Sequence, residues 1–174
     1  MIRVVTGQLE DVDSEAILRP VDSQLEAVTA AGRGVEARAG PEVIERLRRM
    51  GDVPLGGAIV TPAGGLSASF LIHAVVRSQE EPLSKHGVRR ALVNALRQAS
   101  EWELSSLALP PLGAGPGSFD AETAAAIMVP VLQGHLRSVE FPNEIAIVVS
   151  SEYERDAFTR LLDRTVVPED VENA

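Results

Sequence analysis

One loop, residues 110–119 (PPLGAGPGSF), has residue types suited to binding an anion. It follows the apolar run Ser106–Leu109 and precedes Asp120, where an alanine-rich helical stretch begins. Glycines let backbone N–H groups approach a ligand closely, and the positive end of the following helix would face the same space. The loop has neither a Gly-Lys-Ser/Thr sequence nor G-x-G-x-x-G spacing, so it matches neither common nucleotide motif. Anion binding and a tight turn that binds nothing both remain open.

The histidines do not form a recognisable catalytic or metal site. His73 lies inside an apolar segment, where a histidine hydrogen-bonded to its neighbours is more common than a catalytic base. His86 and His135 fall on separate predicted helices, and no carboxylate spacing near them resembles a metal site. The chain has no cysteine, and it contains no G-x-S-x-G sequence. We therefore expect no metal, no cofactor and no classical nucleophile.

The overall charge argues against a general affinity for nucleic acid. Lys and Arg number 16 against 25 Asp and Glu, a formal net charge of −9. Such a balance opposes binding to phosphate backbones or anionic lipid, so a phosphate ligand must be held locally. The basic stretch Arg33–Arg38 could supply local charge, but we favour the solvated start of a helix. No apolar run has the length of a membrane span, and we expect a cytoplasmic protein without a membrane partner.

Strands and helices alternate along the chain. We expect strands at residues 2–6, 16–18, 56–64, 69–76, 105–109 and 144–151, and helices at 41–50, 84–103, from 121 onward and at 153–164. The strands at 56–64 and 69–76 are separated by a short turn and predict a hairpin. Ser84 and Asp120 are predicted N-caps. Pro20 is expected to end the second strand, and Pro130 to kink or end its helix.

This alternation is typical of an α/β fold with a mostly parallel sheet between helices. Ligands of such folds bind outside the carboxyl ends of the strands, which selects the loops after Leu18 and after Leu109. We predict a single domain over residues 1–165 and a flexible acidic tail over residues 166–174. The oligomeric state cannot be predicted from these patterns.

Six segments, in this order, resemble the macro domain, an α/β module that binds ADP-ribose: VVTGQL, AILRPVDSQL, GRGVEARAGPEVIERL, GGAIVTPAGGLSASFLIHAVV, SSLALPPLGAGPGSF and IAIVVSS. The resemblance runs from residue 2 to residue 163. It implies a three-layer α/β/α sandwich with a mixed, mostly parallel sheet of six or seven strands. It also implies a ligand site made of Gln8, Leu9, Asp22, Gly32, Arg33, Gly113, Ala114, Gly115, Pro116, Gly117, Ser118 and Phe119, in which the loop from Gly113 to Phe119 donates backbone N–H groups to a diphosphate.

The chain departs from the family pattern where the base is recognised and where catalysis occurs. The family's Gly-Asp-Ile after the first strand is Gly7-Gln8-Leu9, so the adenine contact loses its charge. The family's Asn-x-x-Asn becomes Arg19-Pro20-Val21-Asp22, which leaves Asp22 as the weak catalytic candidate. The catalytic aspartate of the first glycine loop falls on Gly32, although another alignment offers Glu36. The aromatic that stacks on adenine falls on Ser150, with Tyr153 a few residues beyond.

Three functions follow from the resemblance. The first is a module that binds ADP-ribose, an ADP-ribosylated molecule or a related phosphorylated nucleoside, with Arg19 or Arg33 offsetting the charge of Asp22. The second is an ADP-ribosyl hydrolase in which Asp22 or Glu36 replaces the usual residues. The third is a scaffold domain that binds no nucleotide.

Overall fold

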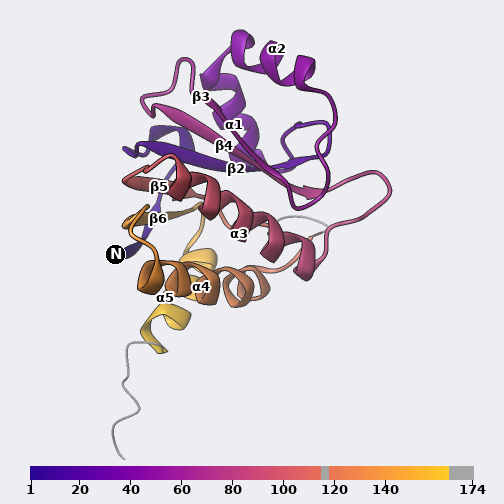
Figure 1. Ribbon diagram of the computed structural model, residues 1–174. Coiled ribbons are helices and arrows are strands. Elements are labelled where there is room, and N and C mark those ends of the chain that lie inside the picture. Colours follow the sequence, from indigo (N-terminus) through magenta and orange to yellow (C-terminus); the bar gives the residue numbers. More distant parts are fainter. Residues whose placement is uncertain (115–117, 165–174) are drawn as a thin grey trace, which may run out of the picture.

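The computed structural model describes residues 1–114 and 118–164, which form a six-stranded sheet with helices on both faces (Figure 1). The strands lie in the order β1 (Ile2–Thr6), β6 (Glu144–Val149), β5 (Ser106–Leu109), β2 (Ala16–Asp22), β4 (Phe70–Arg77) and β3 (Ala58–Pro62). Only the β3–β4 pair of this sheet is antiparallel. The predicted sandwich with a mixed, mostly parallel sheet is confirmed, as is the predicted hairpin.

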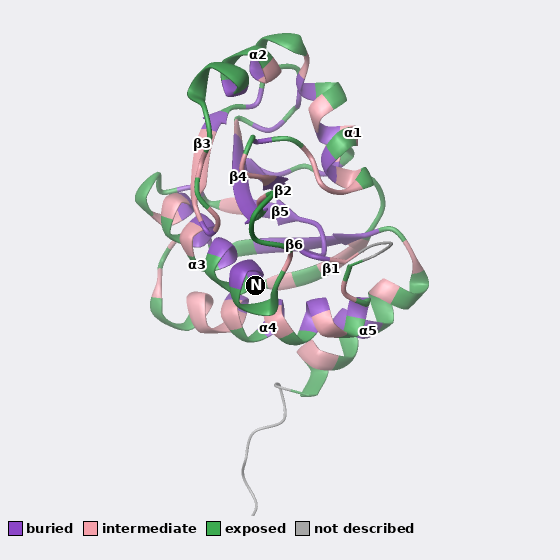
Figure 2. Ribbon diagram, turned by 90° about the vertical axis from the view of Figure 1, so that its right-hand side faces the viewer, coloured by how far each residue is buried: buried purple, intermediate pink, exposed green. Residues whose placement is uncertain are grey.

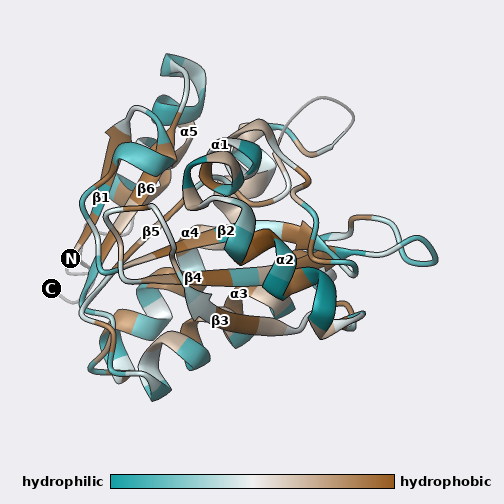
Figure 3. Ribbon diagram, turned by 90° about the horizontal axis from the view of Figure 1, so that it is seen from above, coloured by the Kyte–Doolittle hydropathy of each residue, from teal (hydrophilic) through white to brown (hydrophobic). Residues whose placement is uncertain are grey.

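The helices divide between the two faces of the sheet. One layer holds the short 3-10 helix η1 (Leu9–Asp11), α1 (Ala30–Ala39) and α2 (Pro41–Met50), and the other holds α3 (Lys85–Glu101), α4 (Ala121–Ser138) and α5 (Glu152–Arg164) (Figures 1 and 2). Successive residues of β2 contribute to two core clusters: Leu18 packs with the α3 and α4 side, and Ile17 and Val21 pack with the α1 and α2 side. Strand β2 is therefore apolar on both faces, and Figure 3 shows the central strands in the brown of hydrophobic residues.

Local capping explains where three helices begin. The side chains of Thr29, Ser84 and Asp120 accept hydrogen bonds from the backbone N–H groups three residues later, at Gly32, Gly87 and Thr123. These contacts satisfy N–H groups that the first turn of a helix leaves without partners. The predicted caps Ser84 and Asp120 are confirmed. The basic stretch Arg33–Arg38 lies within α1, as favoured.

The prediction that Pro20 ends the second strand is wrong. Strand β2 continues through Pro20 to Asp22, and Pro20 is paired in register with Ala74 of β4. On its other side, β2 pairs with β5 only at Ala16 and Ile17. Beyond Ile17, the side of β2 that faces β5 forms no ladder of hydrogen bonds. The N–H that Pro20 lacks is therefore not needed for pairing with β5.

Of the two predicted effects of Pro130, a kink or the end of its helix, the second is wrong. Helix α4 runs without interruption from Ala121 to Ser138 with Pro130 inside it. Proline removes the N–H that would bond to the carbonyl four residues earlier, which belongs to Ala126. Both residues are solvent-exposed, so water can hydrate that carbonyl and the helix continues.

Within residues 1–114 and 118–164, no helix is long and apolar enough to cross a membrane.

Candidate functional site

Several of the predicted site residues in the described part of the chain lie at one edge of the sheet. Five strands run in parallel, β1, β6, β5, β2 and β4, so their carboxyl ends share this edge. Gln8 follows β1, Ser150 follows β6, Pro110 follows β5, and Asp22 ends β2. Because β5 lies beside both β6 and β2, the loops after these strands are neighbours in space. Leu9, also predicted to bind ligand, is 1% exposed and its side chain belongs to the core on the α1 side.

The loop after β5 is closed at its base by contacts between Gly113 and Phe119. The N–H of Phe119 donates a 2.8 Å hydrogen bond to the carbonyl of Gly113. Gly113 has a φ of 79°, in the left-handed region, and a Cβ atom there would lie 2.9 Å from Cδ2 of Phe119. Glycine is therefore required by conformation and by space. Three predicted binding residues, Gly115, Pro116 and Gly117, lie outside the described residues.

The N-terminus of α4 follows this loop and already carries a negative cap. Oδ1 of Asp120 accepts a 2.7 Å hydrogen bond from the N–H of Thr123. Hydrogen bonds from the side chain and backbone of Thr123 lower the pKa of the Asp120 carboxyl, and the charge of Lys85 adds to the effect. A carboxylate therefore already occupies the positive end of this helix.

The loop after β2 forms a turn built around Asp22. Oδ1 of Asp22 accepts 3.0 Å hydrogen bonds from the N–H groups of Gln24 and Glu26. The backbone closes the same turn, since Leu25 N–H donates to the carbonyl of Asp22 and Asp22 N–H donates to the carbonyl of Glu26. Leu25 is 2% exposed and has a φ of 65°, which is unusual for a leucine. Asp22 therefore shapes the turn besides presenting a carboxylate at the edge.

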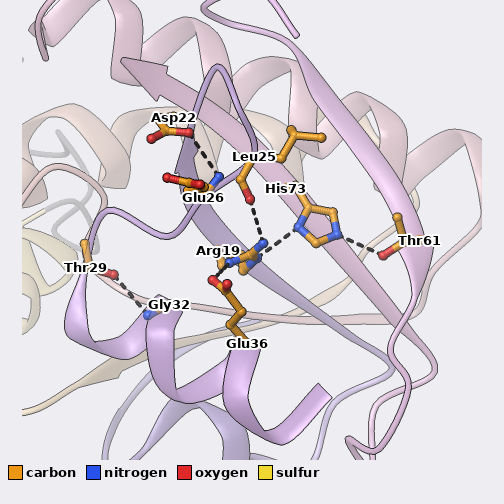
Figure 4. A network of polar contacts seen from close by, with 9 residues as sticks. All are labelled: Arg19, Asp22, Leu25, Glu26, Thr29, Gly32, Glu36, Thr61 and His73. Atoms are coloured by element: carbon orange, nitrogen blue, oxygen red, sulfur yellow. Dashed lines mark hydrogen bonds and ion pairs between the residues drawn. The ribbon is translucent and has the colours of Figure 1, made fainter. Parts of the chain in front are cut away.

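A buried polar network lies beneath this turn (Figure 4). Arg19, 1% exposed, donates from Nε to Nδ1 of His73 over 2.9 Å and from Nη1 to Oε2 of Glu36 over 2.8 Å. Its Nη2 donates to the carbonyl of Leu25 over 3.0 Å. Nε2 of His73 lies 2.8 Å from Oγ1 of Thr61. Because the guanidinium can only donate, Nδ1 of His73 accepts, and the imidazole proton sits on Nε2 and is donated to Thr61.

Electrostatics keep this histidine neutral and its neighbour charged. Burial, and then the positive charge of Arg19, hold the pKa of His73 well below its ordinary value of 6.5. Burial also lowers the pKa of Arg19, and the opposing attraction of Glu36 favours the charged guanidinium. His73 is thus a satisfied core histidine, as the sequence indicated.

The network defines the contacts of two charged residues of the predicted site. Arg19 acts on Asp22 through its charge alone: the carboxylate of Asp22 favours the charged guanidinium and raises the pKa of Arg19, while Nε, Nη1 and Nη2 are bonded to other groups. Glu36, the other candidate carboxylate, is the ion-pair partner of Arg19 through Oε2, and its side chain is 27% exposed. Arg33, another cation of the predicted site, is exposed to solvent in the first turn of α1.

Gly32, which aligns with the family's catalytic aspartate, is buried in the first turn of α1. A Cβ atom at this position would lie 3.2 Å from Oγ1 of Thr29 and 3.4 Å from Cβ of Ala27. The first turn of α1 therefore packs closely on its own cap.

Among the described residues, no group of three His, Asp or Glu side chains could hold a metal ion.

The last strand offers a hydroxyl rather than an aromatic ring at the edge. Oγ of Ser150 donates a 2.6 Å hydrogen bond to Oε1 of Glu154. Tyr153 lies in the first turn of α5 and is 52% exposed. Desolvation, and then the carboxylates of Glu122 and Asp120, raise the pKa of its phenol. Tyr153 is therefore close to the start of α4, where both carboxylates lie.

Comparisons with known proteins agree with this architecture. The family model of the macro domain matches residues 20–128. A protein of Sulfurisphaera tokodaii is 30% identical over 178 residues, covering 97% of this chain and 94% of its own. A macro domain-containing protein of Caldanaerobacter subterraneus subsp. tengcongensis is 26% identical over 170 residues, covering 91% of this chain and 94% of its own.

Solved structures show the same fold. A variant of the Oceanobacillus iheyensis macrodomain, solved with ADPR, superposes with a TM-score of 0.85 at 21% identity, covering 95% of this chain and 93% of that one. The Trypanosoma brucei macrodomain in complex with ADP-ribose gives a TM-score of 0.83 at 16% identity, covering 92% of this chain and 68% of that one. With the family model, the relatives and the fold in agreement, this chain belongs to the macro domain family.

Proposed function

We propose that this macro domain binds ADP-ribose, an ADP-ribosylated molecule or a closely related phosphorylated nucleoside at the carboxyl edge of its sheet. The observation that carries the proposal is the position of two loops on the neighbouring strands β5 and β2. One begins at Gly113, whose conformation requires glycine, and the other is the turn around Asp22. Two homologous folds solved with ADPR or ADP-ribose support the choice of ligand.

In this proposal the diphosphate is bound by the loop from Gly113 to Phe119. Glycines carry no side chain, so their backbone N–H groups can surround phosphate oxygens at short range. Such local binding suits a chain whose net charge of −9 gives no general attraction for phosphate. Exposed Arg33 supplies positive charge near the site. The carboxylate of Asp22 accepts hydrogen bonds from ribose hydroxyls through Oδ2, while Oδ1 stays in the turn.

Base selection is expected to be relaxed in this chain. Gln8 is exposed after β1, and its amide both donates and accepts hydrogen bonds without a charge. A neutral amide discriminates less strongly among base edges than a carboxylate that accepts from the adenine amino group. Binding is therefore expected to depend more on the diphosphate and ribose than on adenine.

Binding is better supported than hydrolysis. A hydrolase needs a group that positions or activates water against the distal ribose. Gly32 carries no such group, Glu36 is paired with Arg19, and Asp22 uses one oxygen to hold its own turn. A nucleotide-free scaffold role is the other alternative, and it predicts no affinity for ADP-ribose.

Calorimetry with ADP-ribose at neutral pH tests the proposal. We expect heat of binding and a rise in melting temperature, because a ligand that binds only the folded state stabilises it. Inosine and guanosine analogues of ADP-ribose should bind within about tenfold of it, and ribose 5-phosphate much more weakly. Absence of both heat and thermal shift at millimolar ADP-ribose would exclude the binding role and favour the scaffold role.

A turnover assay separates the enzyme from the binder. Release of ADP-ribose from ADP-ribosylated protein is compared with a blank without protein. Turnover that Asp22→Ala reduces by about tenfold or more would support the hydrolase instead. Release at the level of the blank, together with calorimetric binding, supports a binding module.

A further inference from the structure

Arg19 occupies a position in the sheet that would ordinarily hold an apolar side chain. Side chains alternate along a strand, so Arg19 points to the same face of β2 as Ile17 and Val21. Both of these belong to the core cluster on the α1 side, and Arg19 is 1% exposed. Taking a guanidinium out of water is costly unless hydrogen bonds and an opposite charge compensate it. The network around Arg19 supplies that compensation.

The bonds of this guanidinium connect the sheet to both segments that follow β2. On the sheet side it bonds to His73, its direct partner in the β2–β4 register, and His73 is bonded in turn to Thr61 of β3. On the other side it bonds to the carbonyl of Leu25 in the turn and to Glu36 on α1. One rigid side chain thus fixes the turn and the helix relative to the strands (Figure 4).

Resting on the proposed function, we infer that Arg19 is a positioning residue for the ligand: it holds the turn of residues 22–26 and the start of α1 in the arrangement that presents Asp22 and Arg33. Leu25 is the residue through which the turn depends most on Arg19. Its left-handed backbone is unfavourable for a leucine, and its carbonyl is held by Nη2 of Arg19. Without that bond, other conformations of the turn gain population, and Asp22 moves with them.

A merely stabilising role for Arg19 makes a different prediction. In that case any loss of ligand affinity would follow from loss of global stability, and variants of equal stability would bind equally. The chain offers a matched control in Thr61→Val. This change is nearly isosteric and leaves the Nε2–H of His73 without its partner inside the core, but it preserves the bond between Arg19 and Leu25.

The experiment combines amide hydrogen exchange without ligand and calorimetry with ADP-ribose. The variants are Arg19→Met, the double variant Arg19→Met/Glu36→Gln and the control Thr61→Val. The double variant removes the carboxylate charge that the single variant leaves without a counter-charge, so it keeps the test valid if Arg19→Met folds poorly. Glu36→Gln alone is the second control, since glutamine can still accept the hydrogen bond from Nη1 of Arg19.

We expect the double variant to exchange the amides of residues 23–28 about tenfold faster than the wild type, with core amides of α3 unchanged. Its dissociation constant for ADP-ribose should rise about tenfold, whereas Thr61→Val should keep the wild-type value. Unchanged exchange in residues 23–28, or unchanged affinity despite faster exchange, would overturn the inference. If the wild type itself does not bind ADP-ribose, the proposed function fails, and the exchange data still decide whether Arg19 orders the turn.

Discussion

The Nε atom of Arg19 donates a 2.9 Å hydrogen bond to Nδ1 of His73, and the two residues are also direct partners in the register of β2 and β4. The contact joins a cation and an imidazole, which attract each other only while the imidazole is neutral. A protonated His73 would lose its acceptor atom and face a like charge in the core. The tautomer, the charge state and the strand register of this pair are therefore consistent with one another.

Stability should fall on acidification because of His73. In the folded state its pKa lies well below 6.5, so between neutrality and its depressed folded pKa the unfolded chain takes up a proton that the folded chain does not. Well above pH 6.5 both states are neutral at this residue, and it has no effect on the pH dependence of stability. Below that pH the free energy of unfolding should decrease by up to about 1.4 kcal/mol per pH unit. Urea unfolding between pH 7.5 and 5.5 measures this slope.

His73→Gln provides the comparison for this slope. The variant is less stable at pH 7.5, since one core hydrogen bond is lost, but its stability should vary less between pH 6.5 and 5.5. His86→Gln, at an exposed position in the first turn of α3, should keep the slope of the wild type. Equal slopes for all three proteins would show that His73 is not the residue responsible.

Asp22 should affect the stability of the fold through its acceptor oxygen rather than through its charge. Asp22→Asn keeps an oxygen for the N–H groups of Gln24 and Glu26, so its melting temperature should stay close to that of the wild type. Asp22→Ala loses both bonds and should cost about 1 kcal/mol of unfolding free energy. Thermal unfolding measures both values. Equal destabilisation by the two changes would mean that the carboxylate charge, rather than the acceptor atom, holds the turn.

Much of the fold could be predicted because its signals are local. The caps Ser84 and Asp120, the hairpin of β3 and β4, and the alternation of strands with helices each depend on a few neighbouring residues. The effects of Pro20 and Pro130 could not be predicted locally, because they depend on the tertiary surroundings of each proline. Pro20 lies where β2 has no β5 ladder partner, and the N–H missing at Pro130 would serve an exposed carbonyl.

The position of the two loops of the candidate site could be predicted from the sequence, but the buried polar network beneath them could not. The rule that ligands bind at the carboxyl ends of parallel strands located the loops after β2 and β5. The network beneath them depends on the register that places Arg19 beside His73, which no local pattern reveals. One signal was present: in Ile17-Leu18-Arg19-Pro20-Val21, strand alternation puts Arg19 on the same face as Ile17 and Val21.

Replacing the helix proline should stabilise the chain. Pro130→Ala restores an N–H that can bond to the carbonyl of Ala126 and removes the ring from an exposed site in α4. Proline inside a helix costs up to about 3 kcal/mol relative to alanine, and the gain here should be smaller because α4 already accommodates the ring. We expect a rise of about 1 kcal/mol in the free energy of unfolding, measured by urea titration. A loss of stability would mean that the ring makes packing contacts worth more than the restored bond.

Gly113→Ala should weaken both the fold and ligand binding. The added methyl group would occupy a left-handed backbone position with a φ of 79° and lie 2.9 Å from Cδ2 of Phe119. We expect a loss of about 1–3 kcal/mol in unfolding free energy and weaker binding of ADP-ribose, because the base of the loop must shift. The control is Gly134→Ala in α4, where a Cβ atom meets nothing within 4 Å. That change should add about 1 kcal/mol of stability and leave ADP-ribose affinity unaltered. Calorimetry and thermal unfolding of both variants decide the matter, and wild-type affinity in a folded Gly113→Ala protein would exclude the base of this loop from the binding site.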